Sequence, residues 1–274
     1  MDCKHSVARR LRVWGPVAVA TAFVAGCGSS APKDAESSWT NERLYSEAQQ
    51  EAEAGSYERS ARLYERLEGR ASGTLMAQQA QIERAYVLYR QNEKAQALSA
   101  IDRFLKLHPT SPAVDYALYL QGLVNFNDNL GILGSLSRQN LSERDQQASR
   151  DAYQSFKLLV EQHPQSRYAE DARLRMNYIL NSLAAYEVHV ARYYYRRGAY
   201  VAAANRAQQT VQEFQQSPST EEALFIMVSS YDRLGLAQLR DDASRVLRQN
   251  FPNSAYLAGE GVVRAPSRPW WQLW

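Results

Sequence analysis

From Asn41 onward, apolar residues recur three or four positions apart, and the intervening residues are mostly Ala, Gln, Glu and Arg. This spacing predicts amphipathic α-helices. The helical stretches are broken by one motif written four times, at His108–Ser111, His163–Ser166, Ser217–Thr220 and Phe251–Ser254. Proline ends a helix, and the following Ser or Thr is a ready N-cap for the next helix. The regular breaks predict an array of helical repeats.

Small residues between these breaks indicate that the helices form pairs. Ala85 and Ala97 lie 12 positions apart, and Ala48 stands before Ser60 in the same way. Small residues at such positions let two helices approach closely, as in tetratricopeptide repeats. The predicted fold is all-α, a right-handed solenoid of about five tetratricopeptide-type helix pairs with about ten helices.

The pairs fall into two groups. Residues 41–163 hold repeats 1–3, with an insertion at about 127–149 that is either a contact loop or a disordered segment. Residues 164–258 hold repeats 4–5, and an unusually long helix is expected from about Tyr168 to Arg197. Residues 259–274 form a tail rich in Pro and Trp, interpreted either as a docking motif or as a segment packed on the domain.

The N-terminus has the features of a bacterial export signal. A basic stretch ends at Arg12, an apolar run extends from Val13 to Val24, and Ala25-Gly26 precede Cys27. This resembles a lipoprotein box, which predicts a signal peptide at 1–26 and N-acyl and S-diacylglycerol lipid on Cys27. Gly28 after the cysteine implies sorting to the outer membrane. Residues 27–40 are expected to be a flexible tether, with the domain facing the periplasm.

Net charge and the search for catalytic or ligand-binding motifs narrow the possible functions further. Removing the leader takes four of 32 basic and one of 29 acidic residues, which leaves 28 of each. A neutral chain gives no electrostatic reason to bind nucleic acid. We find no catalytic constellation, phosphate loop or metal-ligand spacing, so neither an enzyme nor a cofactor is expected.

Aromatic residues concentrate on the helices expected to line the concave face of the first three repeats. These positions predict a peptide groove formed by Tyr45, Ile82, Tyr86, Tyr89, Tyr116, Tyr119, Leu123 and Phe126. About half of the rings are expected to pack against the next repeat instead. The same positions in repeats 4 and 5 are more charged and include Arg192, Tyr195, Arg196, Glu222, Phe225, Asp232 and Arg233.

Three blocks of sequence resemble the BamD family of outer-membrane lipoproteins, called ComL in some bacteria and also YfiO. They are Ala100–Leu123, Arg144–Tyr168 and Ala185–Arg206. The turn Gly69–Thr74 departs from the Arg-Tyr-Pro turn common in this family, so substrate contacts of that turn are not transferred.

The resemblance implies a scaffold in the machinery that assembles β-barrel proteins in the outer membrane. It implies that the C-terminal repeats bind a periplasmic POTRA domain of BamA, that BamC and BamE can join, and that the N-terminal repeats recognise unfolded outer-membrane proteins. Arg206 matches a family position at the BamA contact, and Asn205, Arg197 and Tyr200 are its expected neighbours. A solvated surface arginine is the alternative interpretation of Arg206.

Two other functions share the leader and the repeats. One is a periplasmic repeat lipoprotein that serves pilus secretin assembly or coordinates division with the cell envelope. The other is a repeat module that regulates a cell-wall enzyme, which would bind that enzyme and not BamA.

Overall fold

A computed structural model describes residues 35–126 and 146–257 of the chain. The chain divides into two compact units, residues 1–39 and 40–274. In the first unit the described residues include a short 3-10 helix, η1 (Ala35–Ser38), within the predicted tether. The predicted signal peptide, Cys27, the predicted insertion up to residue 145 and the tail from residue 258 lie outside the described residues.

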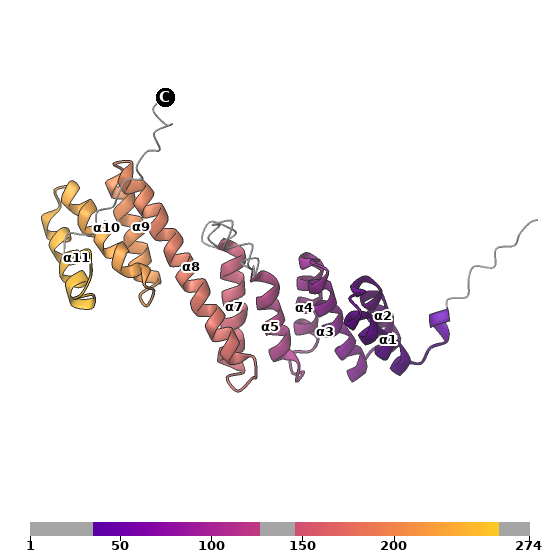
Figure 1. Ribbon diagram of the computed structural model, residues 1–274. Coiled ribbons are helices and arrows are strands. Elements are labelled where there is room, and N and C mark those ends of the chain that lie inside the picture. Colours follow the sequence, from indigo (N-terminus) through magenta and orange to yellow (C-terminus); the bar gives the residue numbers. More distant parts are fainter. Residues whose placement is uncertain (1–34, 127–145, 258–274) are drawn as a thin grey trace, which may run out of the picture. The chain divides into compact units, whose positions relative to one another are not determined.

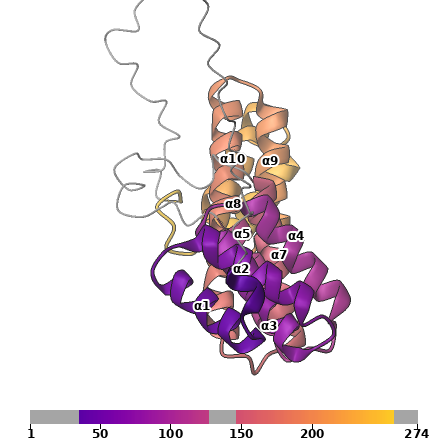
Figure 2. The same cartoon turned by 90° about the vertical axis from the view of Figure 1, so that its right-hand side faces the viewer.

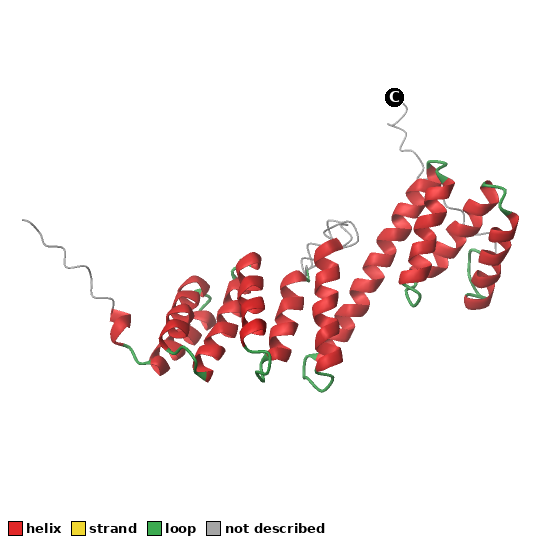
Figure 3. Ribbon diagram, turned by 180° about the vertical axis from the view of Figure 1, so that it is seen from behind, coloured by secondary structure: helices red, strands yellow, loops and turns green. Residues whose placement is uncertain are grey.

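The second unit is helical throughout its described part, as Figure 3 shows. The ten α-helices of this described part are α1 (Asn41–Glu53), α2 (Tyr57–Arg70), α3 (Leu75–Arg90), α4 (Lys94–Leu107), α5 (Val114–Asn125), α7 (Gln146–Gln162), α8 (Ala169–Arg196), α9 (Tyr200–Glu213), α10 (Ser219–Arg233) and α11 (Ala237–Asn250). Each packs on the helix before it (Figures 1 and 2). The predicted all-α repeat fold is confirmed, and α8 is the predicted long helix. No helix in the two described ranges combines the length and apolarity needed to cross a bilayer.

A left-handed residue closes the turn inside four of the pairs. Gly55, Gly198 and Gly235 have φ values of +80°, +78° and +70°, and Asn92 takes the same conformation with φ +65°. At each turn the next residue donates its backbone N–H five positions back, as from Ser56 to Glu51 O at 2.8 Å. This closure satisfies carbonyl groups at the end of the first helix and reverses the chain.

The last three turns between pairs, and the turn after α11, are built on serine. Ser111, Ser166, Ser217 and Ser254 each donate a backbone N–H to the residue three before, and each accepts a backbone N–H from the residue three after. Each serine hydroxyl also accepts the N–H of the residue two after it, at 3.2–3.4 Å. The predicted N-cap role is wrong, because the caps of α5 and α8 are Ala113 and Tyr168 and carry no side-chain hydrogen bond. The serine instead shapes the turn that precedes the helix.

Small residues form the contact inside each pair, as predicted. Ala48, Ser60, Ala85 and Ala97 are all fully buried, and Ser60 Oγ donates to Ala48 O at 2.7 Å. In the third pair a glycine is required. A Cβ built on Gly122 would overlap the fully buried ring of Phe156, so α5 can approach α7 only without a side chain there.

Candidate protein-binding surfaces

One row of side chains on α3 faces outward. Gln79, Glu83, Tyr86 and Arg90 follow one another at helical spacing, and each is at least partly exposed. Gln79 Nε2 donates to Glu83 Oε1 at 2.8 Å, and Arg90 Nη1 donates to the Tyr86 hydroxyl at 2.7 Å. The Arg90 guanidinium also lies over the ring of Tyr57, 4.9 Å from its centroid. The row therefore alternates polar groups with an aromatic ring held in place by its neighbour.

Tyrosines of other helices surround this row. Tyr45 of α1 meets Tyr64 of α2 edge-on, with 6.0 Å between ring centroids. Tyr116 of α5 lies 5.5 Å from Tyr168, and burial raises the pKa of the Tyr116 hydroxyl. The charge of Glu83 raises the pKa values of Tyr45, Tyr64 and Tyr116 further, so all three lie within electrostatic reach of its carboxylate. We call Tyr45, Glu83, Tyr86 and Tyr116 the tyrosine face.

The structure corrects two members of the predicted groove. Ile82 is 1% exposed and Phe126 is 9% exposed, so both belong to the core. Ile82 was misplaced because the outward row is one residue further along α3, and one residue turns a helix by about 100°. Phe126 packs edge-on against Phe156 at 6.3 Å and Tyr178 at 5.8 Å.

The other predicted groove residues divide between packing and surface. Tyr119 and Leu123 are partly buried against the core of α5, α7 and α8. Tyr119 stacks on Tyr168 at 4.7 Å and donates its hydroxyl to Asp171 Oδ2 at 2.7 Å. Tyr45, Tyr86, Tyr89 and Tyr116 remain partly exposed. Glu83 was missed, although the spacing of Gln79, Glu83, Tyr86 and Arg90 could have found it.

Arg206 of α9 is anchored by a buried carboxylate. Its Nη1 lies 2.8 Å from Glu187 Oε2 of α8, and Glu187 is 3% exposed whereas the Arg206 side chain is 41% exposed. A buried ion loses its hydration, so it is stable only when it is paired. One edge of the guanidinium is thus held inside the protein while other N–H groups can face solvent.

The expected neighbours of Arg206 lie on α9 or just before it. Asn205 and Arg197 are exposed, and the Arg197 guanidinium lies 5.4 Å from the ring centroid of Tyr193. Tyr200 is partly exposed and meets Tyr195 edge-on at 5.4 Å. The contact between Glu187 and Arg206 joins residues 19 positions apart, so no local sequence signal predicted it.

Several side chains at the outward positions of repeats 4 and 5 contact one another or a neighbouring ring. Arg192 Nε and Nη2 donate to the two oxygens of Glu222, both at 2.7 Å. Phe225 is stacked by Tyr256 at 4.7 Å. Tyr256 follows the serine turn of Ser254 as Tyr168 follows that of Ser166, so the same stacking arrangement occurs in both halves.

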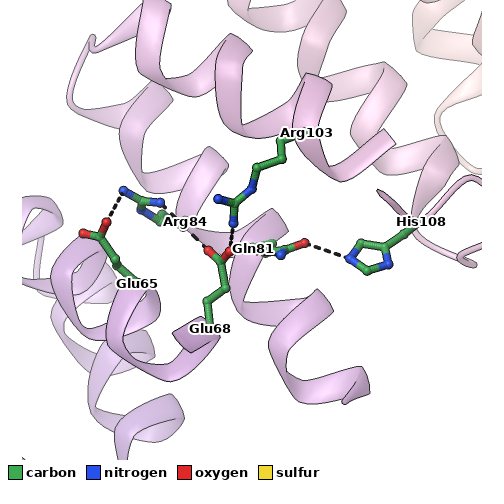
Figure 4. Close-up of polar contacts among 6 residues, drawn as sticks. All are labelled: Glu65, Glu68, Gln81, Arg84, Arg103 and His108. Carbon is green, nitrogen blue, oxygen red and sulfur yellow. Dashed lines mark hydrogen bonds and ion pairs between the residues drawn. The ribbon is translucent and has the colours of Figure 1, made fainter. Parts of the chain in front are cut away.

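A third polar group, shown in Figure 4, joins the first two pairs. Glu68 of α2 pairs with Arg103 of α4 and Arg84 of α3, and Arg84 Nη2 also contacts Glu65 at 3.0 Å. Gln81 donates to Glu68 at 3.0 Å, and its carbonyl oxygen lies 3.0 Å from His108 Nε2. Glu68, Gln81, Arg84 and Arg103 line part of an open pocket of about 340 Å³. The charges of two arginines and two glutamates cancel, and the four side chains come from both helix pairs. We therefore interpret the group as a link between repeats.

Comparison with known proteins identifies the family. The model of the YfiO family, described as an outer membrane lipoprotein, matches residues 38–247. The outer membrane protein assembly factor BamD of Neisseria meningitidis serogroup B is 46% identical over 236 residues, which cover 86% of this chain and 88% of that protein. BamD of Neisseria gonorrhoeae is 44% identical and covers 89% and 92%, and BamD of Xylella fastidiosa is 34% identical and covers 89% and 84%.

The chain belongs to the YfiO (BamD) family. The family match spans both surfaces, from α1 to most of α11. Among the residues that the structure describes, no group of three or more His, Cys, Asp or Glu side chains could hold a metal ion.

Proposed function

We propose that the chain is a scaffold for outer-membrane protein assembly, attached to the outer membrane by lipid on Cys27 and facing the periplasm. In this proposal the C-terminal repeats bind the periplasmic POTRA domain of BamA, and BamC and BamE can join. The observation that carries it is family membership, since relatives at 46% identity over most of the chain are called outer membrane protein assembly factors.

The Arg206 surface is the proposed BamA contact. A guanidinium fixed on one side by Glu187 keeps donors free for a carboxylate or for backbone carbonyls of a partner. Because the arginine is already ordered, less side-chain entropy is lost when a partner binds. Asn205, Arg197 and Tyr200 provide further polar and aromatic groups on the same stretch of chain.

The tyrosine face is the proposed site for unfolded outer-membrane proteins. Partly exposed tyrosines offer flat apolar area together with hydroxyl groups, a combination suited to extended segments of varied sequence. Tyr45, Tyr86 and Tyr116 come from three different helices, so a bound segment would cross the repeats.

The test is capture of partners by the lipidated protein from membranes solubilised in mild detergent, followed by mass spectrometry. We expect BamA with the wild type and less BamA with Arg206→Ala. Arg206→Lys is the matched control, because it keeps the charge but removes the planar fork. If the wild type captures no BamA and instead a secretin or a division protein, the proposal is wrong. Equal capture by all variants would remove Arg206 from the contact.

A further inference from the structure

Glu83 has no cationic partner in the described parts of the chain. Its one hydrogen bond comes from the Gln79 amide at 2.8 Å. Arg90, two turns further along the same face of α3, donates to Tyr86 and lies over Tyr57. Three other glutamates that are partly or fully buried are paired: Glu68 with Arg84 and Arg103, Glu187 with Arg206, and Glu222 with Arg192.

The position of Glu83 makes this lack of a partner costly. The residue is only partly exposed, and burial raises the pKa of its carboxyl above the ordinary value. The charge of Glu83 raises the pKa values of tyrosines on α1, α2 and α5, but none of their hydroxyls donates a hydrogen bond to it in the described structure. A carboxylate that has lost water without gaining a counter-ion favours a cation strongly when one arrives.

The aromatic surroundings add to this preference. A tyrosine ring presents a negative π face that attracts Lys or Arg within about 6 Å, and the attraction grows when water is excluded. Tyr45 and Tyr116, on different helices, both lie within electrostatic reach of Glu83. Arg90 and Arg167 each donate a hydrogen bond to a tyrosine hydroxyl and not to Glu83. Among the four residues of the tyrosine face, Glu83 carries the negative charge.

We propose that Glu83 is the binding residue for a lysine or arginine side chain of the segment that occupies the tyrosine face. This inference rests on the proposed function of that face as the site for unfolded chains. It adds a chemical preference: the bound segment carries a basic residue beside its aromatic residues, so its charge and its rings are recognised together.

The experiment uses the full mature chain in detergent and two synthetic peptides of equal length. Both carry the same aromatic residues, and they differ at one position, which is Lys in one and Gln in the other. Binding is titrated by fluorescence anisotropy for wild type, Glu83→Gln, Tyr86→Ala and Glu58→Gln. Glu83→Gln removes the charge but keeps the shape, and Glu58, whose side chain is 81% exposed on α2, is the matched control for loss of one negative charge.

We expect the wild type and Glu58→Gln to prefer the Lys peptide by about tenfold, the size of one good charge-assisted contact. Glu83→Gln should bind both peptides equally, at the affinity of the Gln peptide. Tyr86→Ala should weaken both peptides by similar factors. A preference retained in Glu83→Gln, or absent from the wild type although both peptides bind, overturns the inference and leaves the proposed function standing. If neither peptide binds the wild type, the proposed function of this face is wrong, and the inference with it.

Discussion

The first three repeats and the last two use the same helical frame but treat their outward positions differently. In repeats 1–3 these positions hold partly exposed tyrosines and Glu83, which has no cationic partner among the residues that the structure describes. In repeats 4 and 5 they hold the doubly bonded Arg192 and Glu222 and the stacked Phe225 and Tyr256. The described N-terminal half therefore keeps several aromatic and charged groups partly exposed, whereas the C-terminal half joins its own groups together.

The C-terminal half offers a partner a different surface. Arg206 lies on α9, the second helix of its pair, and not on the helix that lines the outward row. Under the proposed function a single array would bind two partners at once, because the two proposed surfaces use different helices of different repeats. Substitutions in each half test this separation.

The contact between α5 and α7 in the N-terminal half depends on Gly122. Gly122→Ala should lower the free energy of unfolding by about 1–3 kcal/mol, because the new methyl group would meet the buried Phe156 ring. Urea unfolding followed by circular dichroism measures this. Gly69→Ala on α2 is the matched control, since a Cβ there meets nothing within 4 Å, and it should be neutral or stabilising. Equal effects of the two substitutions would contradict the close approach of α5 and α7.

The ion pair between Arg206 and Glu187 allows a test of stability in the C-terminal half. Arg206→Ala should lower the free energy of unfolding by roughly 2–3 kcal/mol, below the cost for a fully buried pair, because Arg206 is partly exposed. Adding Glu187→Gln removes the orphaned charge and should restore much of this stability.

Partner capture separates this structural effect from loss of the contact. The double variant should regain stability in thermal unfolding but still capture little BamA. If capture returns with stability, Arg206 supports the fold and does not touch the partner. Peptide binding at the tyrosine face should be unchanged in both variants, which checks that the two surfaces are independent.

Tyr168 and Tyr256 occupy corresponding places after a serine turn in the two halves, so substituting each of them compares the halves directly. Tyr168→Ala uncovers Tyr119, and Tyr256→Ala uncovers Phe225, so each should cost about 1–2 kcal/mol from lost burial and ring contact. Only Tyr168→Ala should also alter peptide binding, because Tyr168 contacts Tyr116 of the tyrosine face. A change in peptide affinity for Tyr256→Ala would mean that the halves are coupled.

The smallest effect expected is a pH dependence at Glu83. Its pKa is higher in the folded than in the unfolded chain, so the protonated form favours folding, and this advantage is lost as pH rises through the folded pKa. Glu83→Gln should therefore be more stable than wild type near neutral pH, and the difference should shrink as pH falls. Tyr45, Tyr64 and Tyr116 do not ionise in this range, because their pKa values are raised.

Peptide binding should also depend on whether Glu83 is ionised. Here the charged carboxylate is favourable, whereas for folding it is unfavourable. The Lys peptide should lose its advantage over the Gln peptide in acid, as Glu83 becomes neutral. Titrations between about pH 4 and pH 7, which bracket the ordinary range of a glutamate, measure this. An advantage that persists with the Glu83→Gln variant at every pH would assign the preference to another group.

Much of the fold followed from local patterns. The small residues Ala85 and Ala97 predicted the contact inside a pair, and the Pro- and Ser-containing breaks predicted where pairs meet. The details of the breaks were less predictable, since a serine that shapes a turn and a serine that caps a helix look alike in sequence. Only the hydrogen bonds of Ser111 and Ser166 distinguish them.

The surfaces were harder to predict, because they depend on helix rotation and on distant partners. Tyr86 was placed correctly, yet Ile82, four residues earlier, points into the core, while its neighbour Glu83 is partly exposed. The burial of Glu187 beneath Arg206 depends on how α8 and α9 pack. A spacing rule identifies which residues can share a face, but packing decides which of two adjacent residues does so.

The serine turn has a consequence for how such an array can change in evolution. Ser111, Ser166, Ser217 and Ser254 make the same backbone hydrogen bonds, so the joints are interchangeable at the level of the backbone. A gene segment copied from one serine turn to the next would encode a complete module that begins and ends on matching joints. Lineages could lengthen or shorten the array in whole modules, and new surface residues could then diverge on the added copy while the older surfaces keep their partners.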